Sequence, residues 1–215
     1  GGTSATATLS LSGFIGSETV TVSANAATFS DKNVGTDKTV TVNSITLADG
    51  DNGGVTTNYS IATGNTTTAD ITAKALTIGG ITASNKTYDG NTTATISVAS
   101  ATFTGLVEGD SVTVSATGVF DNKNVGTGKT VTLTETNAGD DVNNYSITAQ
   151  GTTTANVTAK ALTYTVSASD KTYDGGTSAT ATLSLSGFIG SETVTVSANA
   201  ATFSDKNVGT DKTVT

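Results

Sequence analysis

The sequence contains no cysteine, histidine, proline, methionine or tryptophan among its 215 residues. Without cysteine the chain has no disulfides, no thiolate metal ligands and no thiol nucleophile. Without histidine it lacks the side chain that general acid–base catalysis recruits most often. The remaining carboxylates fall mostly in turns, where aspartate is favoured for backbone reasons. We therefore expect that the protein is not an enzyme, with no catalytic and no cofactor-binding residues.

Positive charge is also scarce. All ten basic residues are lysines, and they are outnumbered by 18 carboxylates, which gives a net charge of −8. A nucleic-acid-binding protein needs a basic face that neutralises phosphates, and ten dispersed lysines do not supply one. No apolar run reaches the roughly 18–20 residues that cross a membrane. We therefore expect neither nucleic-acid binding nor membrane insertion of this segment.

Residues that favour β-strands dominate what is present. Threonine, valine and isoleucine are branched at Cβ, which suits the pleated surface of a sheet, and strong helix formers are few. Between residues 75 and 160, strand-like runs lie near 75–83, 92–99, 111–116, 117–121, 129–136, 144–149 and 152–159. Seven short strands in one segment predict an all-β, immunoglobulin-like β-sandwich. The predicted core is Val112, Val114, Phe120, Val131, Leu133, Tyr145, Ile147 and Val157.

The chain repeats itself, because residues 175–215 match residues 1–41 without a single change. Module boundaries follow from side-chain phase, since successive strand residues face opposite sides of a sheet. The apolar positions change phase at Lys74-Ala75 and again at Lys160-Ala161. This predicts a first repeat of type A at 1–74 that lacks its N-terminal strand, and a complete middle repeat of type B at 75–160. It also predicts a last repeat at 161–215, which is a C-terminally truncated copy of A.

No proline-rich or Gly/Ser-rich spacer separates these tandem repeats. Such spacers would act as flexible or semi-rigid linkers between domains. Their absence predicts that neighbouring repeats abut head to tail and form an extended rod. The partners that we expect are therefore the neighbouring repeat modules themselves.

Four motifs recur in a fixed order along the chain. They are Lys-Thr-Tyr-Asp-Gly (86–90, 171–175), Lys-Asn-Val-Gly-Thr (32–36, 123–127), Asn-Tyr-Ser-Ile (58–61, 144–147) and Thr-Ala-Lys-Ala-Leu-Thr (72–77, 158–163). This set resembles the YDG repeat module and its Gly-rich relatives in large bacterial surface proteins, including filamentous-haemagglutinin-like adhesins. The resemblance implies a β-sandwich repeat in the secreted, surface-displayed part of an adhesin. It implies no enzymatic activity, because such repeats act as spacers.

The function that we expect is therefore that of structural stalk repeats, which give length and stiffness to a bacterial adhesin or filament outside the cell. Two alternatives stay open. One is a binding module that contacts glycans or other surface ligands, although the few tyrosines and phenylalanines fall mostly in predicted core positions. The other is a fibre-forming subunit that assembles through exposed strand edges.

The Tyr-Asp-Gly motif is the main candidate for a structural site. We expect the tyrosine to close the end of the sandwich while the Asp-Gly pair makes the adjoining turn. The residues concerned are Tyr88, Asp89, Gly90, Tyr173, Asp174 and Gly175.

The segment Asp-Gly-Asp-Asn-Gly at 49–53 is the candidate metal site. Calcium takes several oxygen ligands from a flexible loop, and Asp49 and Asp51 supply two carboxylates. The EF-hand pattern requires Asp or Asn at the fifth position, where Gly53 stands. We therefore favour a plain acidic turn and keep Asp49 and Asp51 as candidate calcium ligands.

Overall fold

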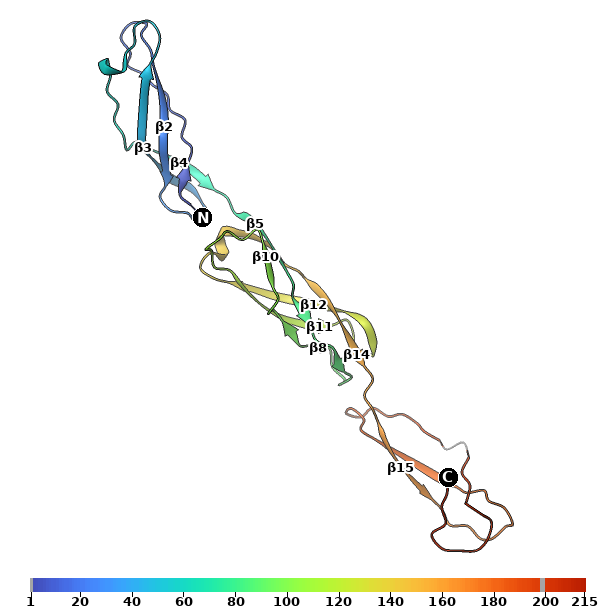
Figure 1. Cartoon of the computed structure of the whole chain (residues 1–215). Helices are drawn as coiled ribbons and strands as arrows, with labels where there is room; N and C mark the ends of the chain where they lie inside the picture. The colour runs from blue at the N-terminus through green and yellow to red at the C-terminus, as the bar shows by residue number, and fades with distance from the viewer. Residues whose placement is uncertain (1, 198–199) are drawn as a thin grey trace. The chain divides into compact units, whose positions relative to one another are not determined.

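The computed structural model describes residues 2–197 and 200–215, and almost all regular structure within them is β (Figure 1). The strands of the first 100 residues are β1 (Ser4–Ala5), β2 (Val20–Phe29), β3 (Gly35–Asp49), β4 (Thr66–Ile71), β5 (Lys74–Gly79), β6 (Thr82–Ala83), β7 (Lys86–Thr87), β8 (Thr93–Ala94) and β9 (Ile96–Ser97). They are followed by β10 (Thr102–Thr104), β11 (Thr113–Phe120), β12 (Gly126–Ala138), β13 (Tyr145–Thr148), β14 (Thr152–Thr158), β15 (Thr163–Ala168) and β16 (Ala181–Ser186). Two single-turn 3-10 helices are described, η1 (Thr56–Asn58) and η2 (Val142–Asn144). The all-β prediction is confirmed.

The chain forms two compact units. Unit 1 consists of Gly1–Thr82, Ile96–Thr117 and Leu133–Gly151, and unit 2 consists of Ala83–Thr95, Gly118–Thr132 and Thr152–Thr215. The middle repeat therefore contributes residues to both units, and β11 and β12 each run from one unit into the other.

Unit 1 contains a four-stranded antiparallel sheet in the order β1-β2-β3-β4. Its centre is the long hairpin of β2 and β3, whose register runs from Val20 opposite Asp49 to Phe29 opposite Val40. Alternation of apolar and polar residues places one face of the hairpin inward. Ala27, Val40 and Val42 are buried on that face. The five-residue loop 30–34 closes the hairpin and carries the first Lys-Asn-Val segment.

A second sheet of unit 1 has the order β10-β5-β13. β5 pairs antiparallel with β10 and parallel with β13. Leu76 of β5 is completely buried and packs in one cluster with Val112 and Tyr145. Because the parallel partner β13 follows β5 by some 70 residues, this core joins the two ends of the middle repeat.

The remaining sheets are a five-stranded sheet in the order β7-β14-β12-β11-β8 and the two-stranded pairs β15-β16 and β6-β9. Within unit 2, β12 pairs antiparallel with β14, and β14 pairs parallel with β7. Val131 of β12 and Val157 of β14 are almost completely buried. In both strands, alternate residues share one face of the sheet, and these two side chains lie on the buried face.

Most of the predicted core is buried in the structure. The buried members are Val112, Phe120, Val131, Leu133, Tyr145 and Val157, whereas Val114 and Ile147 are half-buried. The prediction of separate strands at 111–116 and 117–121 is wrong, because β11 runs unbroken from Thr113 to Phe120. The run 92–99 is divided between β8 and β9, and β10 lies outside every predicted run. The immunoglobulin-like sandwich and the extended rod stay predictions.

One predicted apolar face is exposed. Leu162, Tyr164 and Val166 are the alternating apolar residues that follow the phase change at Lys160-Ala161, but Tyr164 is 68% and Val166 63% exposed. Tyr164 pairs with Leu185 of β16 in the same register in which Ile78 of β5 pairs with Phe103 of β10. Among the described residues, however, β15 pairs with β16 alone, whereas β5 has both β10 and β13 as neighbours. This face of β15 therefore lacks the neighbours that bury Leu76 and Ile78 in β5.

Candidate functional site: contacts between successive repeats

Two sets of residues stand at equivalent positions in all three repeats. The first is an acidic residue followed by Ser or Thr and then Val-Thr-Val, namely Glu18, Asp110 and Glu192. The second is the first lysine of the Lys-Asn-Val-Gly-Thr motif, namely Lys32, Lys123 and Lys206. At two places the structure joins the lysine of one repeat to the acidic residue of the next.

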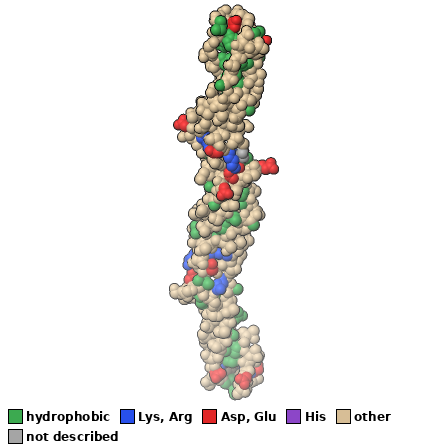
Figure 2. Space-filling model, turned by 90° about the vertical axis from the view of Figure 1, so that its left-hand side faces the viewer, with side chains coloured by type: hydrophobic (Ala, Val, Ile, Leu, Met, Phe, Trp, Pro, Cys, Tyr) green, Lys and Arg blue, Asp and Glu red, His purple; other side chains and the backbone are tan. Residues whose placement is uncertain are grey.

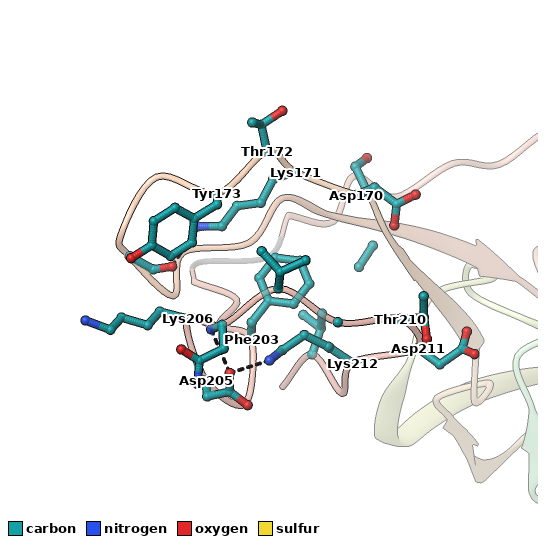
Figure 3. A pocket seen from close by; sticks show the side chains of 17 residues that line it. Asp170, Lys171, Thr172, Tyr173, Phe203, Asp205, Lys206, Thr210, Asp211 and Lys212 are labelled. Carbon is teal, nitrogen blue, oxygen red and sulfur yellow. Dashed lines mark hydrogen bonds and ion pairs between the residues drawn. The ribbon is translucent and has the colours of Figure 1, made fainter.

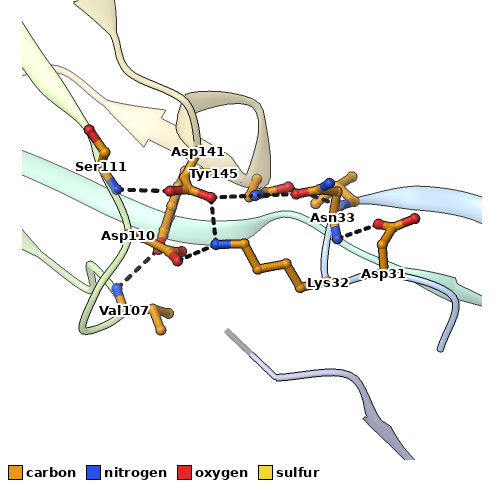
Figure 4. A network of polar contacts seen from close by, with 10 residues as sticks. Asp31, Lys32, Asn33, Val107, Asp110, Ser111, Asp141 and Tyr145 are labelled. Atoms are coloured by element: carbon orange, nitrogen blue, oxygen red, sulfur yellow. Dashed lines mark hydrogen bonds and ion pairs between the residues drawn. The ribbon is translucent and has the colours of Figure 1, made fainter. Parts of the chain in front are cut away.

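The first of these contacts lies in unit 1 (Figure 4). Lys32, in the loop between β2 and β3, places its Nζ 2.9 Å from Asp110 Oδ1 and 2.7 Å from Asp141 Oδ1. The side chain of Asp110 is only 5% exposed, which strengthens a charge–charge contact relative to one in open water. Hydrogen bonding to Asp141 and Asp110 raises the pKa of Lys32. The hydrogen bond from Lys32, and secondly the one from Tyr145, hold the pKa of Asp110 well below its usual range.

A tyrosine of the middle repeat orients the acidic residue. Tyr145 Oη donates to Asp110 Oδ2 at 2.7 Å and accepts from the backbone N–H of Val107 at 3.0 Å. Burial and then the neighbouring Asp110 carboxylate raise the pKa of Tyr145, which keeps its hydroxyl proton available for donation. Ser111 N–H donates to Asp141 Oδ2 at 2.9 Å, so the second carboxylate is also fixed by backbone.

The backbone next to Lys32 is bound as well. Val34 N–H donates to Asn144 Oδ1 at 2.9 Å, and Asn144 Nδ2 donates to Asn33 Oδ1 at 3.1 Å. Asn144 belongs to the middle repeat and directly precedes Tyr145. The entire Lys-Asn-Val segment of the first repeat is thus attached to the middle repeat by an ion pair and by paired amide hydrogen bonds.

The second contact lies in unit 2 and uses the equivalent residues. Lys123 Nζ lies 2.7 Å from Glu192 Oε1, and Tyr88 Oη donates to the same carboxylate oxygen. Lys123 also lies 5.8 Å from the centre of the Tyr88 ring, within range of a cation–π interaction. Lys123 and then Tyr88 lower the pKa of Glu192. The acidic residue of the last repeat is therefore held by two side chains of the middle repeat.

The Tyr-Asp-Gly motif supplies one of these two side chains. Tyr88 is half-buried, and its N–H donates to Thr158 O at 2.8 Å next to the end of β14. Asp89 Oδ1 accepts from Lys86 Nζ at 2.8 Å and from Asn91 N–H at 3.1 Å, which closes the turn. Gly90 has φ +80° and a Cβ placed on it would lie 2.7 Å from Ile189 Cγ2. The turn thus brings backbone of the middle repeat against a side chain of the last repeat.

The second copy of the motif has the same local geometry and different surroundings, since its Tyr173 lies beside the cavity shown in Figure 3. Asp174 Oδ1 accepts from Lys171 Nζ at 2.8 Å and from Gly176 N–H at 2.9 Å, as Asp89 does in its own turn. Gly175 has φ +81°, with nothing within 4 Å of a Cβ placed on it. Tyr173 is 58% exposed and lines a cavity of about 590 Å³ together with Lys206.

The two candidate calcium ligands lie at the end of β3 and in the loop after it. Asp49 Oδ1 accepts the backbone N–H of Thr56 at 2.7 Å, so this carboxylate already stabilises the loop. Asp51 contributes its backbone, because its N–H donates to Thr19 Oγ1 at 2.8 Å. Within residues 2–197 and 200–215, no three Asp or Glu side chains are grouped so that they could hold a metal ion together.

Charged side chains form small mixed patches on the face shown in Figure 2, where lysines lie beside carboxylates over the middle of the chain. No helix of the described residues is long and apolar enough to span a membrane.

Sequence reasoning used the Lys-Asn-Val and Asn-Tyr-Ser segments as repeat markers and missed that they are contact residues. Lys32 and Asp110 are 78 positions apart, and Lys123 and Glu192 are 69 apart. A signal was present, because an acidic residue precedes Val-Thr-Val in each repeat although most other acidic positions vary. Its partner could not be read from one repeat alone, since that partner belongs to the preceding one.

These features define an all-β chain with recurring sequence segments, in which equivalent side chains make the same kind of contact once inside each compact unit. The model of the YDG domain matches three segments of the sequence, residues 1–69, 72–155 and 158–215. The three matches cover nearly the whole chain, and the chain therefore belongs to the YDG domain family. Searches of curated proteins and of solved structures found no match.

Proposed function

We propose that the chain consists of structural spacer repeats of a secreted or cell-surface bacterial adhesin or filament, and that it provides length and stiffness outside the cell. The observation that carries this proposal is the recurring lysine–carboxylate contact between successive repeats. An enzyme or a small-molecule carrier has no need of such a contact at every repeat boundary, whereas a spacer does.

The contact favours stiffness because it restrains the boundary at several points. Domains joined only by a short linker move freely unless their interface is substantial. At the first boundary, the ion pair of Lys32 is combined with the backbone hydrogen bond of Val34 and the amide pair of Asn33 and Asn144. Motion of one repeat against the other must break these bonds together, so we propose that they hold a narrow range of inter-repeat angles.

Distance measurements between spin labels test the stiffness of the first boundary. The chain has no native cysteine, so Thr39→Cys in β3 and Ser146→Cys in β13 introduce two labels at exposed positions of unit 1. We expect a narrow distance distribution that broadens when Lys32→Ala is added. Lys160→Ala is the matched control, because Lys160 is an exposed lysine of unit 2, whereas Lys32 and both labels lie in unit 1. Equal widths with and without Lys32 would contradict a stiffening role.

The extracellular location requires a separate experiment. Intact cells of the source organism are treated with protease, and the loss of this segment from the parent protein is followed with an antibody against it. We propose that the segment is accessible without breaking the cells. Protection that persists until the cells are lysed would contradict a surface location.

Glycan binding is the second candidate function, and the exposed aromatic residues favour it. Tyr164 and Tyr173 are more than half exposed, contrary to the expectation that aromatic residues lie mostly in the core. An exposed ring suits the apolar face of a sugar. Binding on a glycan array that is lost in Tyr164→Ala and Tyr173→Ala, while the fold is retained, would support this function over that of a spacer.

A further inference from the structure

The loop that joins β11 to β12 in the middle repeat brings a lysine, an asparagine and an aspartate into mutual contact. Lys129 Nζ lies 2.7 Å from Asp121 Oδ1 and donates to Asn122 Oδ1 at 2.8 Å. Asn122 Nδ2 donates in turn to Asp121 Oδ2 at 3.2 Å. An amine thus lies against an amide carbonyl, and one carboxylate contacts both the amine and the amide nitrogen.

The start of β12 holds Lys129 in this position. Its side chain is only 8% exposed, which is unusual for a lysine. The pairing of β12 with β14 shifts register between Gly126 and Lys129, and a bulge of this kind re-aims a side chain. The stem of Lys129 passes close to Gly126, where an added Cβ would lie 3.1 Å from Lys129 Cγ and Cδ. The amine is therefore directed at Asn122 and Asp121.

A backbone donor also orients the carbonyl of the asparagine. The N–H of Asn124 donates to Asn122 Oδ1 at 3.0 Å. A fixed N–H aimed at a carbonyl oxygen stabilises the negative charge that develops there when a nucleophile adds to the carbon. The loop thus places together the groups that acyl transfer to an amine requires, namely a nucleophile, an acyl group, a proton carrier and an oxyanion donor.

The corresponding loop of the first repeat has a different chemistry. Seven residues before its lysine, Lys38, it has Asp31 where the middle repeat has Asn122. Asp31 Oδ1 pairs with Lys38 and accepts a backbone N–H two positions on, as Asn122 Oδ1 does. Ser30 stands where the middle repeat has Asp121. One carboxylate is therefore enough for an ion pair at this site, whereas the middle repeat combines an amide with a neighbouring carboxylate.

We propose that Lys129 and Asn122 form an intramolecular isopeptide bond, which links β12 covalently to the residue that follows Asp121. The Asp121 carboxylate takes a proton from the Lys129 ammonium, and the neutral amine adds to Asn122 Cγ. As the Nζ–Cγ bond forms, Asp121 gives its proton to Nδ2 and takes a second one from Nζ.

The step is balanced without any further reactant. The Cγ–Nδ2 bond breaks with its electron pair going to nitrogen, ammonia leaves, and the proton held by Asp121 leaves with it as ammonium. Asn122 is exposed, so the released ammonia reaches solvent directly. The reaction occurs once in each chain, because it consumes the asparagine amide.

The intact mass of the denatured chain tests whether the bond forms. We expect a mass below the sum of the residues by that of one ammonia molecule. Lys129→Arg and Asn122→Ala should each restore the full mass. Lys38→Arg is the matched control and should keep the deficit, because the partner of Lys38 is a carboxylate at the corresponding position. Circular dichroism checks that every variant folds.

Digestion of the unchanged chain with trypsin locates the bond without any variant. Trypsin cuts after Lys86, Lys123, Lys129 and Lys160, and the cut after Lys123 separates Asn122 from Lys129. Acylation of Lys129 prevents the cut there. We therefore expect residues 87–123 to stay joined to residues 124–160 in one branched product, whereas an unlinked chain releases 87–123, 124–129 and 130–160 separately.

The rate at which the mass deficit appears after synthesis tests the role of the carboxylate. Asp121→Ala should slow it at least about 100-fold, because it removes the group that carries the protons. Ser30→Ala, at the corresponding position of the first repeat, is the control and should leave the rate unchanged. An equal rate in Asp121→Ala would contradict the proton transfer assigned to Asp121.

Three results overturn the bond itself. They are a full mass after prolonged incubation at neutral pH, a deficit that persists in Lys129→Arg, and release of residues 87–123 by trypsin from the unchanged chain. The bond joins two residues of one repeat, so this inference goes beyond the proposed spacer function and does not depend on it. A broadened spin-label distribution in Lys32→Ala would support the spacer function whether or not the bond forms.

Discussion

The two Tyr-Asp-Gly turns provide a matched pair of substitutions that isolates a contact between repeats. Gly90 and Gly175 have φ values of +80° and +81°, so alanine at either position pays the same backbone strain of about 1–2 kcal/mol. Only at Gly90 does the new methyl group meet another repeat, with Ile189 Cγ2 at 2.7 Å. Overpacking of this kind adds about 1–3 kcal/mol. We therefore expect Gly90→Ala to be more destabilising than Gly175→Ala by about that amount.

Amide hydrogen exchange at Tyr88 is the measurement that reports on this turn, because its N–H donates to Thr158 O. An excess of 1–3 kcal/mol corresponds to exchange that is about 5–150-fold faster in Gly90→Ala than in Gly175→Ala. Adding Ile189→Ala to Gly90→Ala should recover most of the loss, because it removes the clashing methyl group. Ile15→Ala is the control for that step, since Ile15 is largely exposed. Equal exchange in the two glycine variants would refute the contact.

Three further predictions concern the buried core, stability at acidic pH and calcium binding. Leu76→Ala, at a completely buried position, should lower the free energy of unfolding by about 2–5 kcal/mol, whereas the half-buried Leu162→Ala should lower it by far less, as measured by denaturant titration. The lowered pKa of Asp110 means that its contribution to stability is complete above its ordinary pKa of 3.8 and is lost as pH falls through its lower folded value. In Asp110→Asn, the melting temperature should therefore fall less steeply as pH is lowered into the acidic range, and its dependence on pH near neutrality should stay unchanged. A melting temperature that falls as steeply in the variant as in the unchanged chain would argue against the ion pair. Calcium and chelator should leave the melting temperature unchanged, because Asp49 already accepts a backbone N–H; a rise with calcium that Asp51→Asn abolishes would contradict this.

The positions of buried side chains could be predicted where a strand has a period-two pattern. Val131 and Val157 were identified in this way, because alternation fixes which residues of a strand share a face. Alternation does not say whether anything covers that face. Tyr164 and Val166 have the correct phase and are exposed, since burial depends on a second layer that sequence phase does not reveal.

Strand formation also depended on partners rather than on local sequence. The motif Asn-Tyr-Ser-Ile forms β13 at Tyr145–Thr148, where β5 lies alongside in parallel. The same motif at 58–61 lies outside the strands. Likewise, the sequence of β16 is strand at Ala181–Ser186, where it pairs with β15, and not at 7–12. In both comparisons, within the described residues, a partner strand lies alongside only the copy that forms a strand.

The contacts between repeats follow the same physical logic. Lys32 and Lys123 occupy one motif position, and each pairs with the acidic residue that precedes Val-Thr-Val in the following repeat. A conserved role within a repeat is thus completed by the neighbouring repeat, as in arrays whose stability is a sum of repeat and interface terms. A side chain whose partner lies outside its own repeat, as for Lys32 and Lys123, is therefore best interpreted together with the next repeat in the chain.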